Sequence, residues 1–220
     1  MKKTVITIDG PAGSGKSTVS RLLAKNLGLL YLDTGAMYRA VAFQAKRMGI
    51  GPGQPARLKA LCQGLDLNFV PDGDGTRIHI GEEDVSRAIR SQEMDMLASN
   101  VSAIKEVREA MTGLQRKMAE MSALVAEGRD MGTVVFPEAD HKFFITASPE
   151  VRAKRRTMER LGRGESISEA EVKRELFVRD EQDTKRLIAP LRPAEDAKMI
   201  ETTDLTPFQV VELMMREIKK

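Results

Sequence analysis

The stretch GPAGSGKST at residues 10–18 constrains the fold of this chain more than any other. It follows Val5–Asp9, an apolar and β-branched run typical of a buried strand, and it precedes residues with helical periodicity. Residues 10–17 fill the pattern G-x-x-x-x-G-K-[ST] in the strand–loop–helix setting that this pattern requires. The sequence therefore predicts a phosphate-binding loop at the end of the first strand.

The composition of the loop suits a nucleoside triphosphate. Glycines allow backbone N–H groups to face phosphate oxygens, and a helix N-terminus adds about half a positive charge. Lys16 lies where it reaches the β- and γ-phosphates, and the Ser17 hydroxyl lies where it ligates Mg²⁺. The residues that we expect to contact the donor are Gly10, Pro11, Ala12, Gly13, Ser14, Gly15, Lys16, Ser17 and Thr18.

Length and composition narrow the remaining possibilities. A chain of 220 residues, 41% of them hydrophobic, is enough for one domain that carries a smaller insert. The 35 Lys and Arg residues nearly balance the 32 Asp and Glu residues, and only 4% of the residues are aromatic, so a base-stacking surface for nucleic acid is poorly supported. Cys62 is the single cysteine, which excludes an intrachain disulfide.

Two features concern the place of the chain in the cell. The first strand begins close to Met1, which leaves no room for a signal peptide. No apolar run approaches the roughly 18 residues of a membrane span. We therefore expect a cytoplasmic protein with no membrane partner.

The order of the expected elements is that of an α/β protein. Helical periodicity follows the loop as far as Gly28 and returns at residues 36–48. Short apolar strands are expected at residues 5–9, 29–32, 123–126, 142–147 and 197–201. Two parallel strands joined through a helix make a right-handed crossover, and strands that alternate with helices along the chain form parallel sheets. We therefore expect a parallel sheet flanked by helices.

Residues 50–95 have a different pattern and are predicted to form an insert. After a Pro/Gly linker and a short helix, apolar and polar residues alternate on both sides of a turn at residues 71–75. Period-two alternation around a turn is typical of an antiparallel hairpin. Within it, we expect His79 to be an exposed strand residue and not a metal ligand. The predicted core then comprises residues 1–49 and 96–220.

A strongly basic segment follows Ser148, the expected N-cap of a helix. Against one acid, Glu159, this segment carries Arg152, Lys154, Arg155, Arg156, Arg160 and Arg163. A solvated helix face is the ordinary interpretation of such a run. A lid that closes over transferring phosphates also needs cations on a mobile element, so we expect residues 152–166 to form a lid within the core.

The helix that starts at the capping box of Ser168 and Glu171 carries a second informative pattern. One face of this helix, at steps of 4, 3, 4 and 3, carries Val172, Leu176, Arg179, Asp183 and Arg186. The polar end of this stripe is either a solvated ion pair or the wall of a polar ligand site. A nearby triphosphate site favours the ligand site.

Other charged residues are expected at the carboxyl-terminal edge of the sheet, where open α/β sheets bind ligands. Arg39 lies one turn into the helix after the second strand, and Arg129 and Asp130 directly follow the third strand. A local ion pair is the alternative for Arg129 and Asp130. Arg108 flanks the apolar stripe of a helix near residues 104–121, where its side chain either contacts a ligand or extends to solvent.

Four segments together resemble the bacterial cytidylate kinases. They are GPAGSGKST at residues 10–18, LDTGAMYR at residues 32–39, EGRDMGTVVFP at residues 127–137 and RDEQDTKRLIAPL at residues 179–191. The resemblance covers nearly the whole chain, and residues 50–95 resemble the enlarged monophosphate-binding region of that family. It implies a P-loop nucleoside monophosphate kinase fold: a five-stranded parallel sheet in the order 2-3-1-4-5, a small antiparallel insert and a helical lid.

The resemblance implies a role for each matching residue. Contacts to the acceptor are implied for Thr34 and Arg39 (the monophosphate), Ser99, Arg108 and Asp130 (the cytosine edge), Arg129 and Arg186 (the acceptor phosphate), and Arg179 and Asp183 (the pentose). Contacts to the donor phosphates are implied for Arg152, Arg155 and Arg156. Some family members have Gly at the position of Ser17, which leaves open whether Ser17 or Thr18 ligates the metal.

The implied reaction transfers the γ-phosphoryl group of ATP to CMP, with dCMP as a second acceptor and Mg²⁺ on the donor. The side chains expected to act in catalysis are those of Lys16, Arg152, Arg156 and Arg186. A kinase for another acceptor, such as UMP or AMP, is the alternative within this class. A GTPase is disfavoured because no N-K-x-D motif follows the D-x-x-G at residues 72–75, and a nucleic-acid-dependent ATPase because the net charge is only +3. The family suggests a monomer.

Overall fold

The computed structural model describes residues 3–72 and 75–219. These form two compact units, one made of Met1–Leu32 and Ala123–Lys220 and the other of Asp33–Ser122. Each unit is described by itself. The second unit is larger than the insert expected at residues 50–95, because it also takes in helices on both sides of that stretch.

The first unit is built on a parallel sheet. Its strands are β1 (Val5–Asp9), β2 (Leu30–Asp33), β6 (Leu124–Gly128), β7 (His141–Thr146) and β8 (Lys198–Glu201). Among the described residues they form one five-stranded sheet in the order β2-β6-β1-β7-β8. Counted along the chain this order is 2-3-1-4-5, so the predicted topology is confirmed. The central strand β1 lies between β6 and β7, and its Ile6 is aligned with Val125 and His141.

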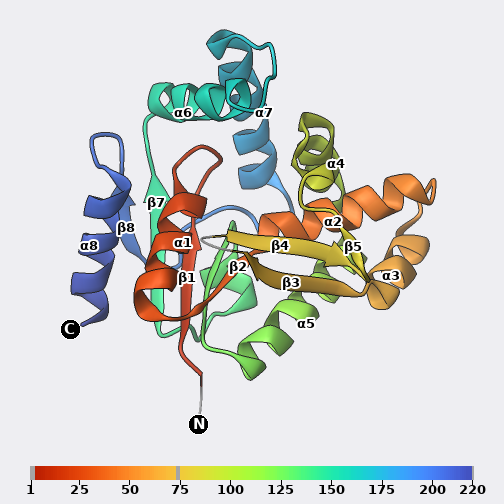
Figure 1. Ribbon diagram of the computed structural model, residues 1–220, viewed down its shortest axis with the longest axis horizontal. Helices are drawn as coiled ribbons and strands as arrows, with labels where there is room; N and C mark the ends of the chain where they lie inside the picture. Colours follow the sequence, from red (N-terminus) through yellow and green to blue (C-terminus); the bar gives the residue numbers. More distant parts are fainter. Residues whose placement is uncertain (1–2, 73–74, 220) are drawn as a thin grey trace. The chain divides into compact units, whose positions relative to one another are not determined.

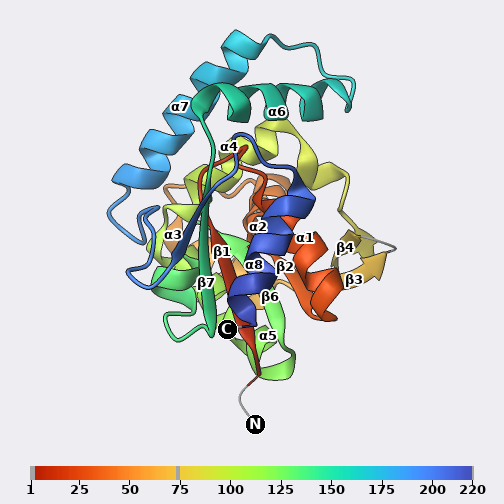
Figure 2. The same ribbon diagram turned by 90° about the vertical axis from the view of Figure 1, so that its left-hand side faces the viewer.

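Two helices cover one face of this sheet. Figure 2 shows α1 (Lys16–Leu27) and α8 (Pro207–Ile218) side by side in front of the strands. Their apolar faces pack on the strands in a core that includes Ile6, Ile8, Phe143, Leu23 and Met214. Gly28 ends α1 in the left-handed conformation (φ +65°), as its position after the last helical residue predicts.

Helices α6 (Pro149–Leu161) and α7 (Glu169–Lys185) lie beyond the carboxyl-terminal end of β7 (Figure 1). Ser148 caps α6 by accepting from the Val151 N–H at 3.3 Å, and Ser168 forms the predicted capping box with Glu171 at the start of α7. A small apolar cluster joins the two helices to the loop after β1 and consists of Ala12, Ala153, Val172 and Leu176.

The second unit packs a small antiparallel sheet on a helix. Strands β3 (Leu67–Asp72), β4 (Gly75–Ile80) and β5 (Glu83–Asp84) form this sheet, which confirms the predicted hairpin. The middle of its turn, residues 73–74, lies outside the described residues, and with it the interior of the D-x-x-G match. His79 is a strand residue as expected, although it is half-buried and not exposed.

Helix α2 (Thr34–Arg47) supplies the other side of this apolar core. Its Ala36 and Ala40 pack against Ile78, Val85 and Ile89. The remaining elements are α3 (Pro55–Gly64), η1 (Ala88–Arg90), α4 (Gln92–Ser102) and α5 (Lys105–Met121). Helix α2 begins two residues earlier than expected, because the Asp33 carboxylate caps it by accepting from the Ala36 N–H at 2.8 Å.

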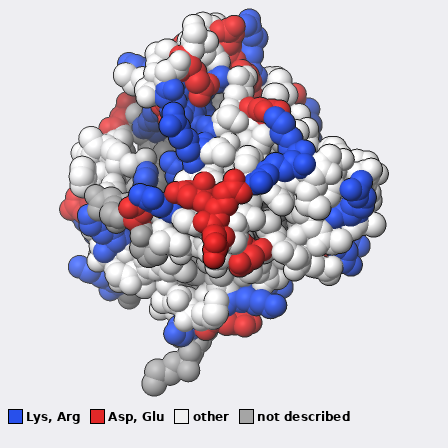
Figure 3. Space-filling view, turned by 45° about the vertical axis from the view of Figure 1, so that its right-hand side comes forward, with Lys and Arg blue, Asp and Glu red and all other residues white. Residues whose placement is uncertain are grey.

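On the face shown in Figure 3, acidic side chains gather near the centre and basic side chains lie on both sides of them. Among the described residues, no helix combines the length and the apolar character needed to cross a membrane.

Candidate active site

The loop after β1 has the backbone of a phosphate cradle. Gly10, Gly13 and Gly15 have φ values of +147°, +75° and +92°, a region that side chains disfavour. A Cβ on Gly10 would lie 2.0 Å from the Ile145 carbonyl oxygen, and one on Gly13 would lie 2.8 Å from that of Arg152. Glycine is therefore required at residues 10 and 13 for both conformation and space, and at residue 15 for conformation. The hydroxyl-bearing Ser17 and Thr18 are exposed at the start of α1.

Lys16 is a buried cation within this loop, with 6% of its surface exposed. Its ammonium group donates to the Pro11 carbonyl oxygen at 2.7 Å. Burial lowers the pKa of Lys16 well below its usual value, and the neighbouring Arg129 and Arg179 lower it further. The anionic phosphates of a nucleoside triphosphate would stabilise the charged form of Lys16, so the loop and its lysine fit such a ligand.

A cluster of two arginines and two aspartates joins the end of β6 to the end of α7. Arg129 donates through Nε to Asp183 Oδ2 at 2.7 Å, and Arg186 donates to Asp130 Oδ1 at 3.4 Å. Arg186 also lies 4.0 Å from Asp183 and donates to the Ala189 carbonyl oxygen at 2.5 Å. The structure thus brings four of the predicted acceptor residues together in the first unit.

Electrostatics keeps the acid at the centre of this cluster ionised. Burial alone would raise the pKa of Asp183, but Arg129, Arg179 and Arg186 together hold it below its ordinary value. Val172 and Leu176, on the same face of α7, are buried. The face therefore changes from apolar core to a buried polar cluster, and Asp183, with 6% exposure, is not part of a solvated surface ion pair.

The basic segment on α6 is only partly a solvated helix face, because some of its cations are buried whereas Lys154 and Arg163 are exposed. Arg152 and Arg160 are buried. Arg152 bonds to Asp180 at 2.6 Å and to the Ala12 carbonyl oxygen at 3.1 Å. Arg160 bonds to Glu165 and Glu175. The segment therefore joins α6 to α7 and to the phosphate-binding loop.

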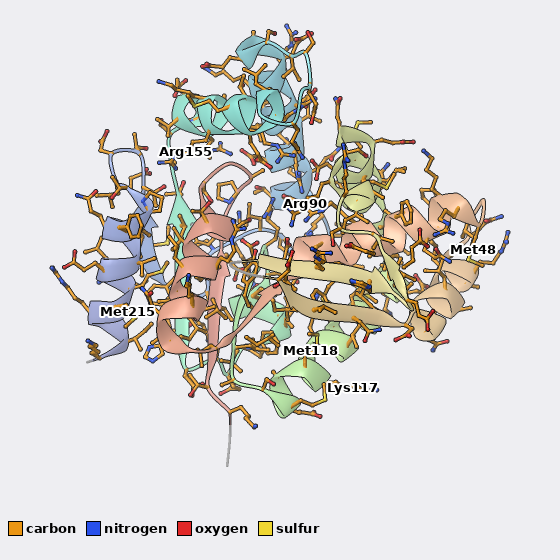
Figure 4. All side chains as sticks on the ribbon, viewed as in Figure 1. Met48, Arg90, Lys117, Met118, Arg155 and Met215 are labelled. Atoms are coloured by element: carbon orange, nitrogen blue, oxygen red, sulfur yellow. The ribbon has the colours of Figure 1, made fainter. Side chains whose placement is uncertain are left out.

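Two further arginines of the segment differ in their surroundings. Arg155 points from α6 toward the loop after β1 (Figure 4), where it donates to the Ser14 carbonyl oxygen at 3.4 Å and to Thr202 Oγ1 at 3.1 Å. Arg156 pairs with Glu159 at 2.7 Å within α6. Of the three expected donor contacts, Arg152 and Arg155 thus lie against the phosphate-binding loop itself.

The second unit holds the other predicted acceptor residues. Arg39 pairs with Asp33 at 3.2 Å and lies 3.8 Å from Asp95 of α4. Thr34 is buried at the first position of α2.

Arg108 and Ser99 lie on the two helices that follow. Arg108, with 4% exposure, donates to the Ser102 carbonyl oxygen at 3.0 Å and lies over the Tyr38 ring at 5.6 Å. It is therefore not a side chain that extends to solvent. Ser99 is half-buried on α4, and its carbonyl oxygen accepts from the Ser102 hydroxyl at 2.8 Å.

Some charged residues next to these sites were not predicted from the sequence as site residues. Asp9, at the end of β1, accepts from the backbone N–H groups of Met131 and Gly132. Glu127 accepts from the Tyr31 hydroxyl at 2.5 Å, and Asp180 pairs with Arg152. A charged residue at the end of an apolar strand can be recognised in the sequence as a candidate site residue. Both Asp9 and Glu127 fit this pattern.

A P-loop on a 2-3-1-4-5 sheet, beside a cluster of arginines, defines a kinase of the P-loop class. The profile of the cytidylate kinase family matches residues 6–220. This chain therefore belongs to the cytidylate kinase family.

Individual relatives agree with this assignment. A cytidylate kinase of Geobacter sp. (strain M21) is 49% identical over 216 residues, which cover 98% of this chain and 93% of that protein. A cytidylate kinase of Pseudomonas syringae pv. tomato is 46% identical over 220 residues, which cover 99% of this chain and 96% of that protein.

Solved structures agree on the fold alone. An uncharacterized protein from Eubacterium ventriosum aligns with a TM-score of 0.57 at 14% identity, over 99% of both chains. Shikimate kinase from Bacteroides thetaiotaomicron aligns with a TM-score of 0.51 at 11% identity, also over 99% of both chains.

Proposed function

We propose that this kinase transfers the γ-phosphoryl group of ATP to CMP, with dCMP as a second acceptor. The observation that carries the proposal is the cluster of Arg129, Asp130, Asp183 and Arg186 in the same unit as the phosphate-binding loop. Two arginines suit an acceptor phosphate, and two aspartates suit the amino and hydroxyl donors of a nucleoside. Membership of the cytidylate kinase family supports cytosine as the base.

On the donor side, the backbone of residues 10–18 and the Lys16 ammonium group hold the triphosphate. Lys16, Arg152, Arg155 and Arg156 neutralise charge on the transferring group. Ser17, or Thr18 beside it, would hold Mg²⁺, which would supply further neutralisation of the donor phosphates. Both hydroxyls are exposed at the helix start, where a cation on the phosphates could reach them.

On the acceptor side, Arg129 and Arg186 hold the phosphate of CMP, and Arg179 and Asp183 contact its pentose. Thr34 and Arg39 also hold the monophosphate, and Ser99 and Arg108 contact the base. The nucleophile is a phosphate oxygen whose second pKa is about 6, so it is largely ionised at neutral pH. Catalysis then rests on positioning and on charge neutralisation and needs no general base.

Asp130 gives the base preference in this proposal. Cytosine presents an N4 amino donor, which a carboxylate accepts, whereas uracil presents an oxygen that a carboxylate repels. Asp130→Asn should therefore reduce the ratio of kcat/KM for CMP over UMP by about tenfold, since a charged hydrogen bond contributes on the order of 1.5 kcal/mol or more. An unchanged ratio would remove Asp130 from base recognition.

A coupled assay of ADP release with CMP, dCMP, UMP, AMP and shikimate tests the function. We expect CMP to give the highest kcat/KM and dCMP to follow it. No stimulation by CMP would refute the proposal, and a preference for UMP or AMP would place the acceptor elsewhere in the same class of kinases.

We also propose that the chain acts as a monomer in the cytoplasm, as its family suggests. Size-exclusion chromatography with light scattering should give a mass near 24.4 kDa. A mass of twice that value would contradict the monomer.

A further inference from the structure

Asp9 lies at the carboxyl end of the central strand, directly before the first glycine of the phosphate-binding loop. Its carboxylate, 4% exposed, accepts from the Met131 N–H through Oδ1 at 2.9 Å and from the Gly132 N–H through Oδ2 at 2.8 Å. One side chain thus connects the start of the donor loop to the segment that follows Arg129 and Asp130.

The segment that Asp9 holds is a wide turn, η2 (Met131–Val135), which begins immediately after Asp130. The Asp130 carbonyl oxygen accepts from the N–H groups of Val134 at 2.9 Å and Val135 at 3.2 Å. These two hydrogen bonds fix the backbone of Asp130 from its carboxyl side. Asp9 fixes η2 itself, because it binds the first two N–H groups of η2.

Gly132 packs closely in this arrangement. A Cβ at this position would lie 3.0 Å from Thr7 Oγ1 and 3.5 Å from Asp9 Oδ2. The turn consequently has little space in which to move relative to β1, and an added methyl group would push it away from Asp9.

The charge of Asp9 is unfavourable in this place. Burial raises the pKa of Asp9 to about 6, and the negative charge of the nearby Asp130 also raises it. The two backbone hydrogen bonds and the charge of Lys16 lower the pKa, but they do not outweigh burial. A neutral side chain at this site would avoid the cost of burying the charge. A carboxylate, however, has two acceptor oxygens for two parallel N–H groups, which an amide does not have.

We propose that Asp9 is a positioning residue that holds the turn after Asp130, and so presents Arg129 and Asp130 to the acceptor nucleotide in a fixed place relative to the donor loop. The inference rests on the proposed function of Arg129 and Asp130. It identifies a residue outside the acceptor contacts on which cytosine recognition depends.

Asp9→Asn is the first test, because its amide has the shape of Asp9 but only one acceptor oxygen. The other N–H group of the turn would then face an amide donor and lose its partner. We expect the KM for CMP to rise about tenfold and the CMP over UMP ratio to fall, since losing a buried hydrogen bond costs about a factor of ten. The KM for ATP should change less than about twofold, and the melting temperature at pH 7 should not fall, because a buried charge is removed at the same time.

Asp140→Asn is the matched control. Asp140 also accepts from a backbone N–H group of β1, that of Val5 at 2.8 Å, but at the opposite end of the strand. We expect this variant to leave both KM values and the base preference at the wild-type level.

Gly132→Ala reaches the same turn without changing any charge. We expect it to reproduce the rise in the KM for CMP with the KM for ATP preserved, and Thr7→Ala in the same chain should restore part of the loss by making space for the methyl group.

The inference is overturned if Asp9→Asn melts like the wild type and keeps the wild-type KM for CMP and base ratio. It is also overturned if Asp9→Asn raises the KM for CMP and the KM for ATP alike and lowers the melting temperature as well. That pattern is expected of a residue that only stabilises the fold. If the wild-type protein prefers another nucleotide to CMP, the proposed function is contradicted but the positioning role of Asp9 is not. The same variants should then raise the KM for that nucleotide.

Discussion

At the scale of single residues, the first unit contains two buried carboxylates with opposite pKa shifts. Burial dominates at Asp9 and raises its pKa to about 6, whereas at Asp183 the arginines outweigh burial and the pKa is lowered. Asp9 has two backbone N–H groups and one lysine near it, and Asp183 has three guanidinium groups. The sign of each shift thus follows from the number of cations whose charge acts on the carboxylate.

The pH dependence of stability should reveal Asp9. A raised folded-state pKa means that the folded state keeps the proton longer, so this contribution to stability is fully present below about pH 4 and is lost as the pH rises through about 6. A shift from 3.8 to about 6 corresponds to about 3 kcal/mol. Urea unfolding between pH 4 and 7 should show Asp9→Asn gaining stability relative to the wild type as the pH rises.

Asp183 should act in the opposite direction. Its lowered pKa stabilises the folded state above pH 3.8, and that stability is lost as the pH falls below this value. A constant difference in the free energy of unfolding between wild type and Asp9→Asn across pH 4 to 7 would contradict the assignment for Asp9, because Asp183 is ionised throughout that range.

Asp33 performs two tasks that one substitution separates. One oxygen caps α2 and the other pairs with Arg39. Asn is as good a cap as Asp but has no charge for the arginine, so Asp33→Asn should keep the melting temperature near that of the wild type. We expect the KM for CMP to rise several-fold, because an ion pair with partly buried partners then no longer holds Arg39.

Asp33→Ala is the control for the cap. It should raise the KM in the same way and also lower the free energy of unfolding by about 1 kcal/mol, the usual cost of losing an N-cap. Equal KM values for the wild type and Asp33→Asn would show that Arg39 does not depend on this partner.

At the scale of elements, local signals decided how well the helices could be predicted. Ser148 and the capping box at Ser168 predicted the starts of α6 and α7, and both are confirmed. Helix α4 was not predicted, although Ser91 caps it and two acids follow in its first turn. The boundary expected between insert and core, at residues 95 and 96, divides this helix, so its first turn was assigned to the insert and its remaining turns to the core.

The end of α7 offers a comparison between two neighbouring cations. Arg186, 10% exposed, bonds within the buried cluster, whereas Lys185, 74% exposed, pairs only locally with Glu181 in the contacts that the structure gives it. We expect Arg186→Ala to lower kcat/KM for CMP by on the order of 100-fold, because in the proposed function Arg186 holds the acceptor phosphate in the transition state.

Lys185→Ala should leave kcat/KM within about twofold of the wild type, since exposed pairs contribute little. If the two variants had the same activity in steady-state assays, the polar end of the α7 stripe would be a structural ion pair only.

At the scale of the whole molecule, the chain order of strands and helices predicted a parallel sheet, and the resemblance to the cytidylate kinases predicted its strand order. The order 2-3-1-4-5 is confirmed, as is the antiparallel hairpin. The contacts between segments far apart in the chain, such as Asp9 with Gly132 or Arg152 with Asp180, were not predicted from the sequence. Periodicity shows which face of an element is buried, but it does not show which partner a buried charge will find.

The same limit applies to the basic segment on α6. Its charge indicated either a solvated surface or a lid, but its arginines are divided among several different partners. Arg160 bonds to two glutamates between α6 and α7, while Arg155 bonds to the loop after β1 and to Thr202. A role for residues 152–166 as a lid stays a prediction, and so do the insert boundaries at residues 50 and 95.

In the reaction assigned to this kinase, the γ-phosphoryl group of ATP passes to CMP. Incubation with ATP labelled in the γ-position, followed by separation of the nucleotides, tests it most directly. We expect the label to appear in CDP, equimolar UMP to receive at most about a tenth as much, and Asp130→Asn to narrow this difference. Label released only as inorganic phosphate, or shared equally between CMP and UMP by the wild-type protein, would contradict it.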